Sequence, residues 1–159
     1  MTQRLNFFQA SPDAMNTLVN AEKYITRCYK VKKTLSQTLI ELVKIRVSQI
    51  NGCAYCIDMH TKDARAAGVS EQRIYALSAW REAPFYTPLE QAALAWAEAN
   101  TRVHKDNISD ELYQQVTEHF NPEQLVDLTI VVTTINSWTR VALSFKPEAG
   151  SYNVGDFDF

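Results

Sequence analysis

The stretch of residues 35–68 constrains the fold more than any other part of the chain. Apolar residues recur at helical spacing from residue 35 to residue 51, and Ser36 is a suitable N-cap for a helix there. The pair Asn51-Gly52 then stops this helix, because both residue types tolerate the left-handed conformation. A second helix is predicted over residues 53–67, with a glycine after it. Since the break between them is so short, we expect the two helices to pack antiparallel.

Four polar residues of this helix pair form a candidate site. Cys53 and Cys56 make a C-x-x-C pattern, and His60 follows Cys56 by four residues. These spacings put the three side chains on one helix face, with the cysteines close enough for a disulfide. Glu41 lies beside the apolar seam of the first helix, roughly 15 Å back from the turn, while His60 lies roughly 10 Å beyond it. Antiparallel packing is therefore expected to bring Glu41 next to His60.

These residue types are suited to thiol chemistry. A thiol attacks as its thiolate, so its pKa must fall from about 8.5. The N-terminal turn of the second helix stabilises negative charge on either sulfur, and His60, oriented by Glu41, can take the Cys56 proton. A peroxide can then oxidise one thiolate to a sulfenic acid, with which the second cysteine condenses to form a Cys53–Cys56 disulfide. The residues alone leave open which cysteine attacks, because the helix N-terminus favours Cys53 and the contact with His60 favours Cys56.

A zinc site is the alternative for the same four residues. Zinc can bind Cys53, Cys56 and His60, with Glu41 as a fourth ligand. That spacing on one helix is not a common closed zinc frame, and the sequence has neither a second C-x-x-C nor an H-x-x-x-H pattern. We therefore predict no metal at the site.

Composition limits the class of protein. Apolar residues make up 46% of the 159 residues and charged residues 21%, which fits one globular domain with its own core. The net charge of −2, with no dominant basic cluster, argues against nucleic acid as the main partner. No apolar run approaches the length of a membrane span, and residues 1–13 lack the apolar core of a signal peptide. With three cysteines and no export signal, we expect a reducing, cytoplasmic location.

The rest of the chain adds only helical patterns. Further helices, each behind a capping residue, are predicted over residues 12–29, 71–80, 88–103, 110–119 and 122–144. The β-branched stretch 126–136 is also compatible with a strand, but the length of the pattern and the Asn121-Pro122 start favour a helix. We therefore predict a single all-α domain of six or seven helices over residues 1–159.

The chain ends and two isolated residues carry further expectations. Phe7 and Phe8 are expected to dock on this domain or on a neighbouring subunit. The tail, residues 147–159, contains three aromatic residues and is expected either to be disordered or to reach onto another subunit. Cys28 is expected to pack as a small apolar residue. Tyr55 is a secondary site candidate, which either hydrogen-bonds within the site or packs at its mouth.

The chain resembles the AhpD-like alkylhydroperoxidases, of the carboxymuconolactone decarboxylase superfamily, in Glu41, Cys53, Cys56 and His60 and in their setting, NGCAYCIDMHTKDARAAG. The resemblance covers residues from about 15 to 103. It implies an all-helical fold, homo-oligomers that are commonly trimers or hexamers, and peroxide reduction without metal, haem or flavin. It further implies that Cys56 is the peroxidatic thiol and that Cys53 resolves it and receives the reductant. His60 and Glu41 are, by the same resemblance, the proton relay.

One position departs from the family pattern. The best-characterised branch has a histidine just before the second cysteine, and this chain has Tyr55 there. Tyrosine relays protons less easily near neutral pH, so the rate of peroxide reduction or the reductant is expected to differ. The resemblance implies an external dithiol reductant, such as a lipoyl or thioredoxin-like protein. Two alternatives stay open: a decarboxylase-type lyase, which does not rely on a C-x-x-C pair, and a redox sensor whose disulfide is a non-catalytic switch.

Overall fold

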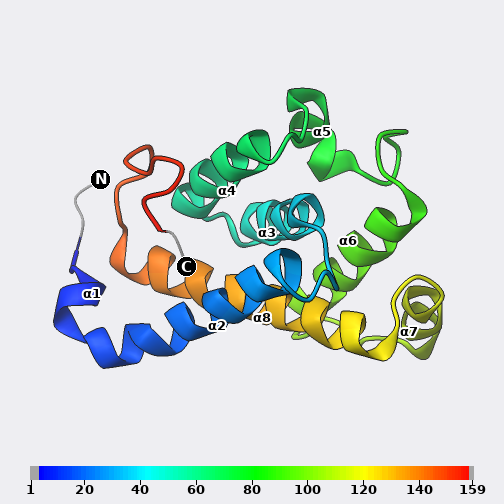
Figure 1. Cartoon of the computed structure of the whole chain (residues 1–159), viewed down its shortest axis with the longest axis horizontal. Coiled ribbons are helices and arrows are strands. Elements are labelled where there is room, and N and C mark those ends of the chain that lie inside the picture. Colours follow the sequence, from blue (N-terminus) through cyan, green and yellow to red (C-terminus); the bar gives the residue numbers. More distant parts are fainter. Residues whose placement is uncertain (1–3, 158–159) are drawn as a thin grey trace.

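The computed structural model describes residues 4–157, which form eight α-helices and one 3-10 helix and include no strand. In chain order they are α1 (Phe7–Ala10), α2 (Pro12–Lys30), α3 (Gln37–Asn51), α4 (Ala54–Ala66), α5 (Glu71–Tyr75), η1 (Ala76–Ala79), α6 (Pro88–Thr101), α7 (Asp110–Thr117) and α8 (Pro122–Phe145) (Figure 1). The all-α prediction is confirmed. The short helix α1 is the element that the sequence did not predict.

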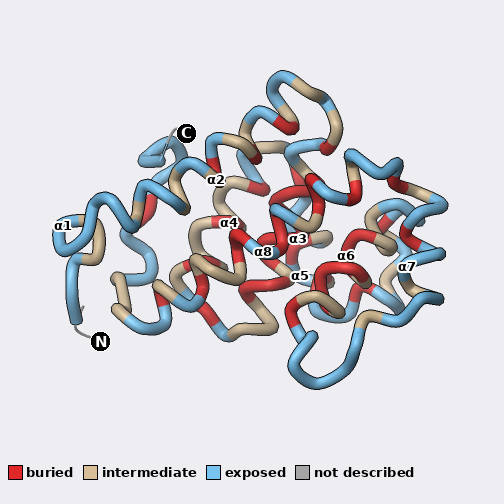
Figure 2. Tube along the Cα trace, turned by 90° about the horizontal axis from the view of Figure 1, so that it is seen from below, coloured by how far each residue is buried: buried red, intermediate tan, exposed pale blue. Residues whose placement is uncertain are grey.

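Helix α3 lies at the centre of the fold and packs against α4, α6 and α8. Its buried apolar residues include Leu39, Ile40, Leu42, Val43, Ile45 and Val47. Figure 2 shows buried positions concentrated along α3 and the neighbouring parts of α4, α6 and α8, while α1 is mostly exposed. A helix that is enclosed in this way can hold a charged side chain only where that charge is paired or meets a polar cavity.

The helix ends follow the capping residues of the sequence. The Ser36 hydroxyl accepts a hydrogen bond from the Leu39 N–H at 3.2 Å, and Gly52 ends α3 in the left-handed conformation. The β-branched stretch 126–136 is helical within α8. Three of its β-branched side chains, Val131, Val132 and Ile135, are fully buried, so packing outweighs the preference of these residues for strands.

The predicted helix over residues 71–80 is instead the five-residue α5 followed by the 3-10 helix η1. Its buried residues, Ile74, Leu77 and Trp80, are spaced three apart. A 3-10 helix has three residues per turn, so the tighter winding keeps Leu77 and Trp80 on the core side. The other predicted helices end within two residues of the observed ends.

Helix α1 docks on this domain, which was one of the two outcomes expected for the aromatic residues near the start. The ring of Phe7 lies 5.9 Å from that of Phe145, and the ring of Phe8 lies 6.2 Å from that of Trp138. Within residues 4–157, no helix combines the length and the apolar character that crossing a membrane requires.

The described part of the tail, residues 147–157, folds back onto the domain beside α4 (Figure 1). Its residue Tyr152 is buried, with 5% of its surface exposed. Disorder therefore does not describe this segment, which is packed on its own domain. The third aromatic residue of the tail, Phe159, lies outside the described residues.

Candidate active site

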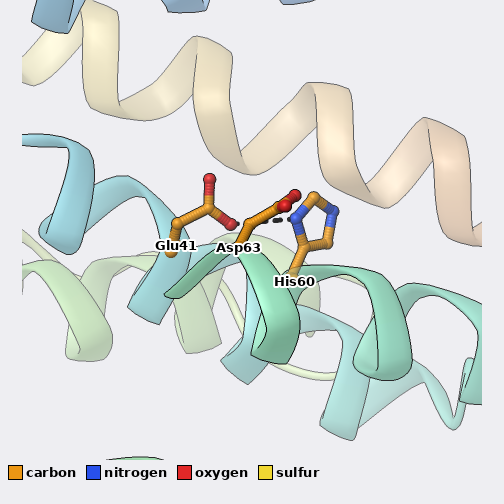
Figure 3. Close-up of side chains that lie close together, drawn as sticks. All are labelled: Glu41, His60 and Asp63. Carbon is orange, nitrogen blue, oxygen red and sulfur yellow. Dashed lines mark hydrogen bonds and ion pairs between the residues drawn. The ribbon is translucent and has the colours of Figure 1, made fainter. Parts of the chain in front are cut away.

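The antiparallel pair of α3 and α4 brings Glu41 and His60 together. Gly52, with a φ of 69°, reverses the chain between the helices, and Asn51 fixes the turn by donating a hydrogen bond to the side chain of Asn136 on α8. Glu41 Oε2 lies 3.0 Å from His60 Nδ1, and both residues are buried. The second ring nitrogen of His60 points away from the carboxylate (Figure 3).

Glu41 is held in its charged form. Burial opposes ionisation, but the hydrogen bond with His60, the charge of His60 and the nearby Lys44 outweigh it and lower the pKa of Glu41 below its ordinary value. At 3.0 Å the carboxylate can accept a hydrogen bond from His60 Nδ1 and so fixes the orientation of the imidazole ring.

Both cysteines lie at the start of α4, and both are free and buried. Cys53 is the N-cap residue, and its Sγ accepts a hydrogen bond from the Cys56 N–H at 3.3 Å. A sulfur at this position faces unsatisfied N–H groups and the positive end of the helix dipole. The two sulfurs therefore share a site that favours one negative charge.

That charge rests first on Cys53. The hydrogen bond from the Cys56 thiol lowers the pKa of Cys53 to about 7. Burial opposes this shift, and the backbone N–H groups of Cys56 and Tyr55 add to it. The same hydrogen bond holds the proton on Cys56 and, together with burial, raises the pKa of the Cys56 thiol. The pair therefore favours a negative charge on Cys53 over one on Cys56.

A cavity of about 300 Å³ adjoins this pair. Cys56, His60 and Glu41 line it, whereas Cys53 does not. Tyr55 also lines it and packs against the core, and burial raises the pKa of its hydroxyl. A molecule in the cavity thus meets Cys56 before Cys53. Within residues 4–157, no hydrogen bond joins His60 to either sulfur, so proton transfer from Cys56 to His60 needs a side-chain movement or a bridging molecule.

Two further features of the cavity were not predicted. Asp63 lies next to the relay, with its carboxylate, the Glu41 carboxylate and a His60 nitrogen all within 4.8 Å of one another (Figure 3). It follows His60 by three residues, so it shares the helix face of the site, and this spacing is the signal that could have identified it.

The second feature is a buried ion pair in the cavity wall, Lys44 Nζ to Glu22 Oε2 at 2.7 Å. It joins helices α3 and α2, and no sequence pattern marks it.

The residues that could hold a metal ion differ from those of the zinc alternative. In the described part of the chain, the one cluster of three metal-binding side chains at this separation is Glu41, His60 and Asp63, and neither sulfur belongs to it. The frame of two cysteines, one histidine and one glutamate that the alternative requires is not assembled in this geometry.

The fold and the site define an all-helical protein in which a C-x-x-C pair begins a buried helix beside a Glu–His pair. The sequence model of the carboxymuconolactone decarboxylase family matches residues 12–99. The chain belongs to this family, and the AhpD-like resemblance drawn from its site residues is confirmed.

Known relatives support the same placement. The chain is 45% identical over 151 residues to the uncharacterized protein YdfG of Bacillus subtilis (strain 168), covering 95% of this chain and 99% of that protein. It is 36% identical to the solved structure of ATU0492 from Agrobacterium tumefaciens, with a TM-score of 0.86 over 95% of this chain and 100% of that one. ATU0492 is described as a protein of unknown function with a suggested role in antioxidant defence as an AhpD. The debrominase Bmp8 shares the fold, with a TM-score of 0.78 and 18% identity over 91% of this chain and 75% of that one.

Proposed function

We propose that this protein is a thiol-dependent peroxidase of the alkylhydroperoxidase type, which reduces organic or hydrogen peroxide through Cys56 and a Cys53–Cys56 disulfide. The observation that supports this most directly is the position of Cys56. It lies between a cavity large enough for a small molecule and a sulfur whose pKa is lowered to about 7. In the same proposal the enzyme needs no metal or bound cofactor and works as a homo-oligomer, a trimer or hexamer, in the cytoplasm.

The first chemical step places the negative charge on Cys56. Transfer of the Cys56 proton to Cys53 leaves a thiolate that faces the cavity. It attacks the terminal peroxide oxygen, so that an S–O bond forms and the O–O bond breaks. The leaving alkoxide takes a proton from His60, whose protonated form Glu41 stabilises, and the products are an alcohol and a Cys56 sulfenic acid.

The second step closes the disulfide. The Cys53 sulfur attacks Cys56, an S–S bond forms, the S–O bond breaks, and the hydroxyl group leaves with the Cys53 proton as water. Two electrons have then passed from the cysteine pair to the peroxide. An external dithiol, from a lipoyl or thioredoxin-like protein, returns them by thiol–disulfide exchange and completes the cycle.

The test counts thiols during reaction. Reduced, metal-free protein is mixed with cumene hydroperoxide, and free thiols and intact mass are followed for the wild type, Cys56→Ser and Cys53→Ser. We expect the wild type to lose two thiols and to cycle when a dithiol is supplied, and Cys53→Ser to stop as a sulfenic acid on Cys56. Inert thiols together with stoichiometric zinc in the purified protein would instead support the metal alternative.

A redox sensor uses the same two thiols, so turnover separates it from a peroxidase. A sensor oxidises once per molecule and is then only slowly reduced, whereas a peroxidase consumes peroxide in large excess over protein. A decarboxylase-type lyase needs neither cysteine, so it would keep its activity on a lactone substrate in Cys53→Ser and Cys56→Ser.

A further inference from the structure

The tail forms one wall of the cavity that contains Cys56. Four of its residues line the cavity: Tyr152, Val154, Gly155 and Phe157. Phe7 and Phe8 of α1 and Trp138 of α8 line it as well. Figure 1 shows the tail next to the end of α8 and the start of α4, and the Phe157 ring of the tail contacts Phe8 of α1. Residues of α1 and of the tail, which are far apart in the sequence, thus line the same cavity.

Polar contacts with three side chains of α4 fasten the tail to this helix, which carries the candidate site. The Gly150 N–H donates to Asp58 Oδ2 at 3.2 Å, and Lys62 Nζ donates to the Tyr152 carbonyl at 2.8 Å. The Tyr152 hydroxyl donates to Asp63 Oδ1 at 2.7 Å. Because all three partners project from one helix, the tail is positioned relative to that helix.

Aromatic rings complete this wall. The ring of Phe157 lies 5.9 Å from that of Tyr152 and 6.3 Å from that of Phe8, nearly parallel to both. The ring of Phe8 lies 6.2 Å from that of Trp138. The four rings form a continuous apolar cap over the cavity, and each ring is held by its neighbours. Removing one ring of such a cap opens the cavity without touching the sulfurs.

Asp63 connects the tail to the Glu41–His60 pair. Burial raises the pKa of the Asp63 carboxyl, and the hydrogen bond from Tyr152 acts against this rise. Glu41 raises the pKa further, whereas His60 and Lys44 lower it, and Glu22 is paired with Lys44. The Tyr152 hydroxyl therefore favours a charged Asp63 beside His60.

We infer that the tail is part of the active site, in which Tyr152 is a positioning residue that acts through Asp63 on His60, and Phe157 sets the size of the molecules that reach Cys56. The inference rests on the proposed function only in taking Cys56 as the reacting group. It goes beyond that function because it assigns a role to a segment that the family model does not include.

Access is tested by alkylation, which needs no peroxide. Reduced protein reacts with iodoacetamide or with the bulky iodoacetamidofluorescein, and modification of Cys56 is followed by peptide mass spectrometry. We expect Phe157→Ala to raise the rate ratio of the bulky to the small reagent at least about fivefold, since the cap is lost. Phe157→Leu should give a smaller rise, and Tyr113→Ala, which removes an exposed ring on α7, should give none. An unchanged ratio in both Phe157 variants would overturn the role of the wall.

Positioning is tested by the pH profile of the iodoacetamide reaction. Tyr152→Phe keeps the ring and removes the hydrogen bond to Asp63. Without that bond the Asp63 carboxylate is no longer held in place beside His60, so the midpoint of Cys56 reactivity should shift by about one pH unit. Asp63→Asn should give the same shift, the double variant no more, and Tyr113→Phe none. Phe157→Ala should leave the midpoint in place.

The outcomes separate the two proposals. A lower melting temperature in Tyr152→Phe with an unchanged midpoint would mean that the tyrosine only stabilises the fold, and would overturn its positioning role. Shifted midpoints in a protein that does not turn over peroxide would leave the inference standing and refute the proposed function. Turnover of peroxide with unchanged midpoints and unchanged rate ratios would support the proposed function and overturn the inference about the tail.

Discussion

Glu41 Oε2 lies 3.0 Å from His60 Nδ1, at a place where neither side chain is more than 10% exposed. A buried carboxylate of lowered pKa thus faces the imidazole at hydrogen-bond distance, with little water to screen its charge.

The first prediction concerns this pair. Glu41→Gln keeps the shape of the side chain and removes the negative charge that faces His60 Nδ1. We expect peroxide reduction to slow at least about tenfold and the pH midpoint of thiol reactivity to rise. Stopped-flow kinetics over a range of pH measures both, with Glu118→Gln, at an exposed position, as the control. Wild-type kinetics in Glu41→Gln would remove the relay from the mechanism.

The second prediction concerns the cysteine pair. The hydrogen bond from the Cys56 thiol is the largest cause of the pKa of about 7 at Cys53. Cys56→Ala removes that donor while burial remains, so the pKa of Cys53 should rise to about 8.5 or above. The ultraviolet absorbance of the thiolate, titrated with pH, reports this value. Cys28 should not interfere, because burial raises its pKa. A Cys53 pKa that stays near 7 in the variant would show that the helix N-terminus suffices.

The third prediction concerns the ion pair in the cavity wall. Lys44 and Glu22 are both buried, so removing one partner leaves the other charge without compensation. Lys44→Met should lower the free energy of unfolding by about 3–5 kcal/mol, measured with denaturant. Adding Glu22→Leu should restore much of the loss. The matched control is Arg65→Met, which breaks the exposed pair with Glu71 and should cost less than about 1 kcal/mol.

The fourth prediction concerns the loop between α2 and α3. Asp127 of α8 is 1% exposed and accepts hydrogen bonds from Tyr24, Lys32 and Thr34. Burial opposes ionisation of Asp127, but the bonds from these three side chains outweigh it and lower its pKa. Asp127→Asn should therefore cost about 3 kcal/mol of unfolding free energy at neutral pH.

The pH dependence of that cost checks its origin. A carboxyl whose pKa is lowered by folding stabilises the protein above its unfolded value of about 3.9, and the contribution is lost as the pH falls through the folded value. The difference between wild type and Asp127→Asn should be largest near neutral pH and shrink below about pH 4. A difference that is the same at both ends of this range would point to lost packing instead of lost charge.

The sequence predicts those parts of the site that depend on spacing along one helix or across one short turn. The contact of Glu41 with His60 follows from two helices and a two-residue break, and the closeness of Cys53 and Cys56 follows from three residues of helix. The ion pair of Lys44 with Glu22 and the bond of Tyr152 to Asp63 could not be predicted in this way. They join segments whose relative placement depends on how the whole set of helices packs, which local periodicity does not encode.

The position of Cys53 at the start of α4 has a consequence for the energetics of electron exchange. As a thiolate, its sulfur is stabilised by the helix dipole and by the N–H of Cys56, and a disulfide sulfur carries no charge for these groups to stabilise. The stabilisation therefore belongs to the reduced state alone and raises the reduction potential of the pair. A disulfide formed at this position would be a better oxidant than one between two solvated cysteines, so a milder dithiol would suffice to reduce it.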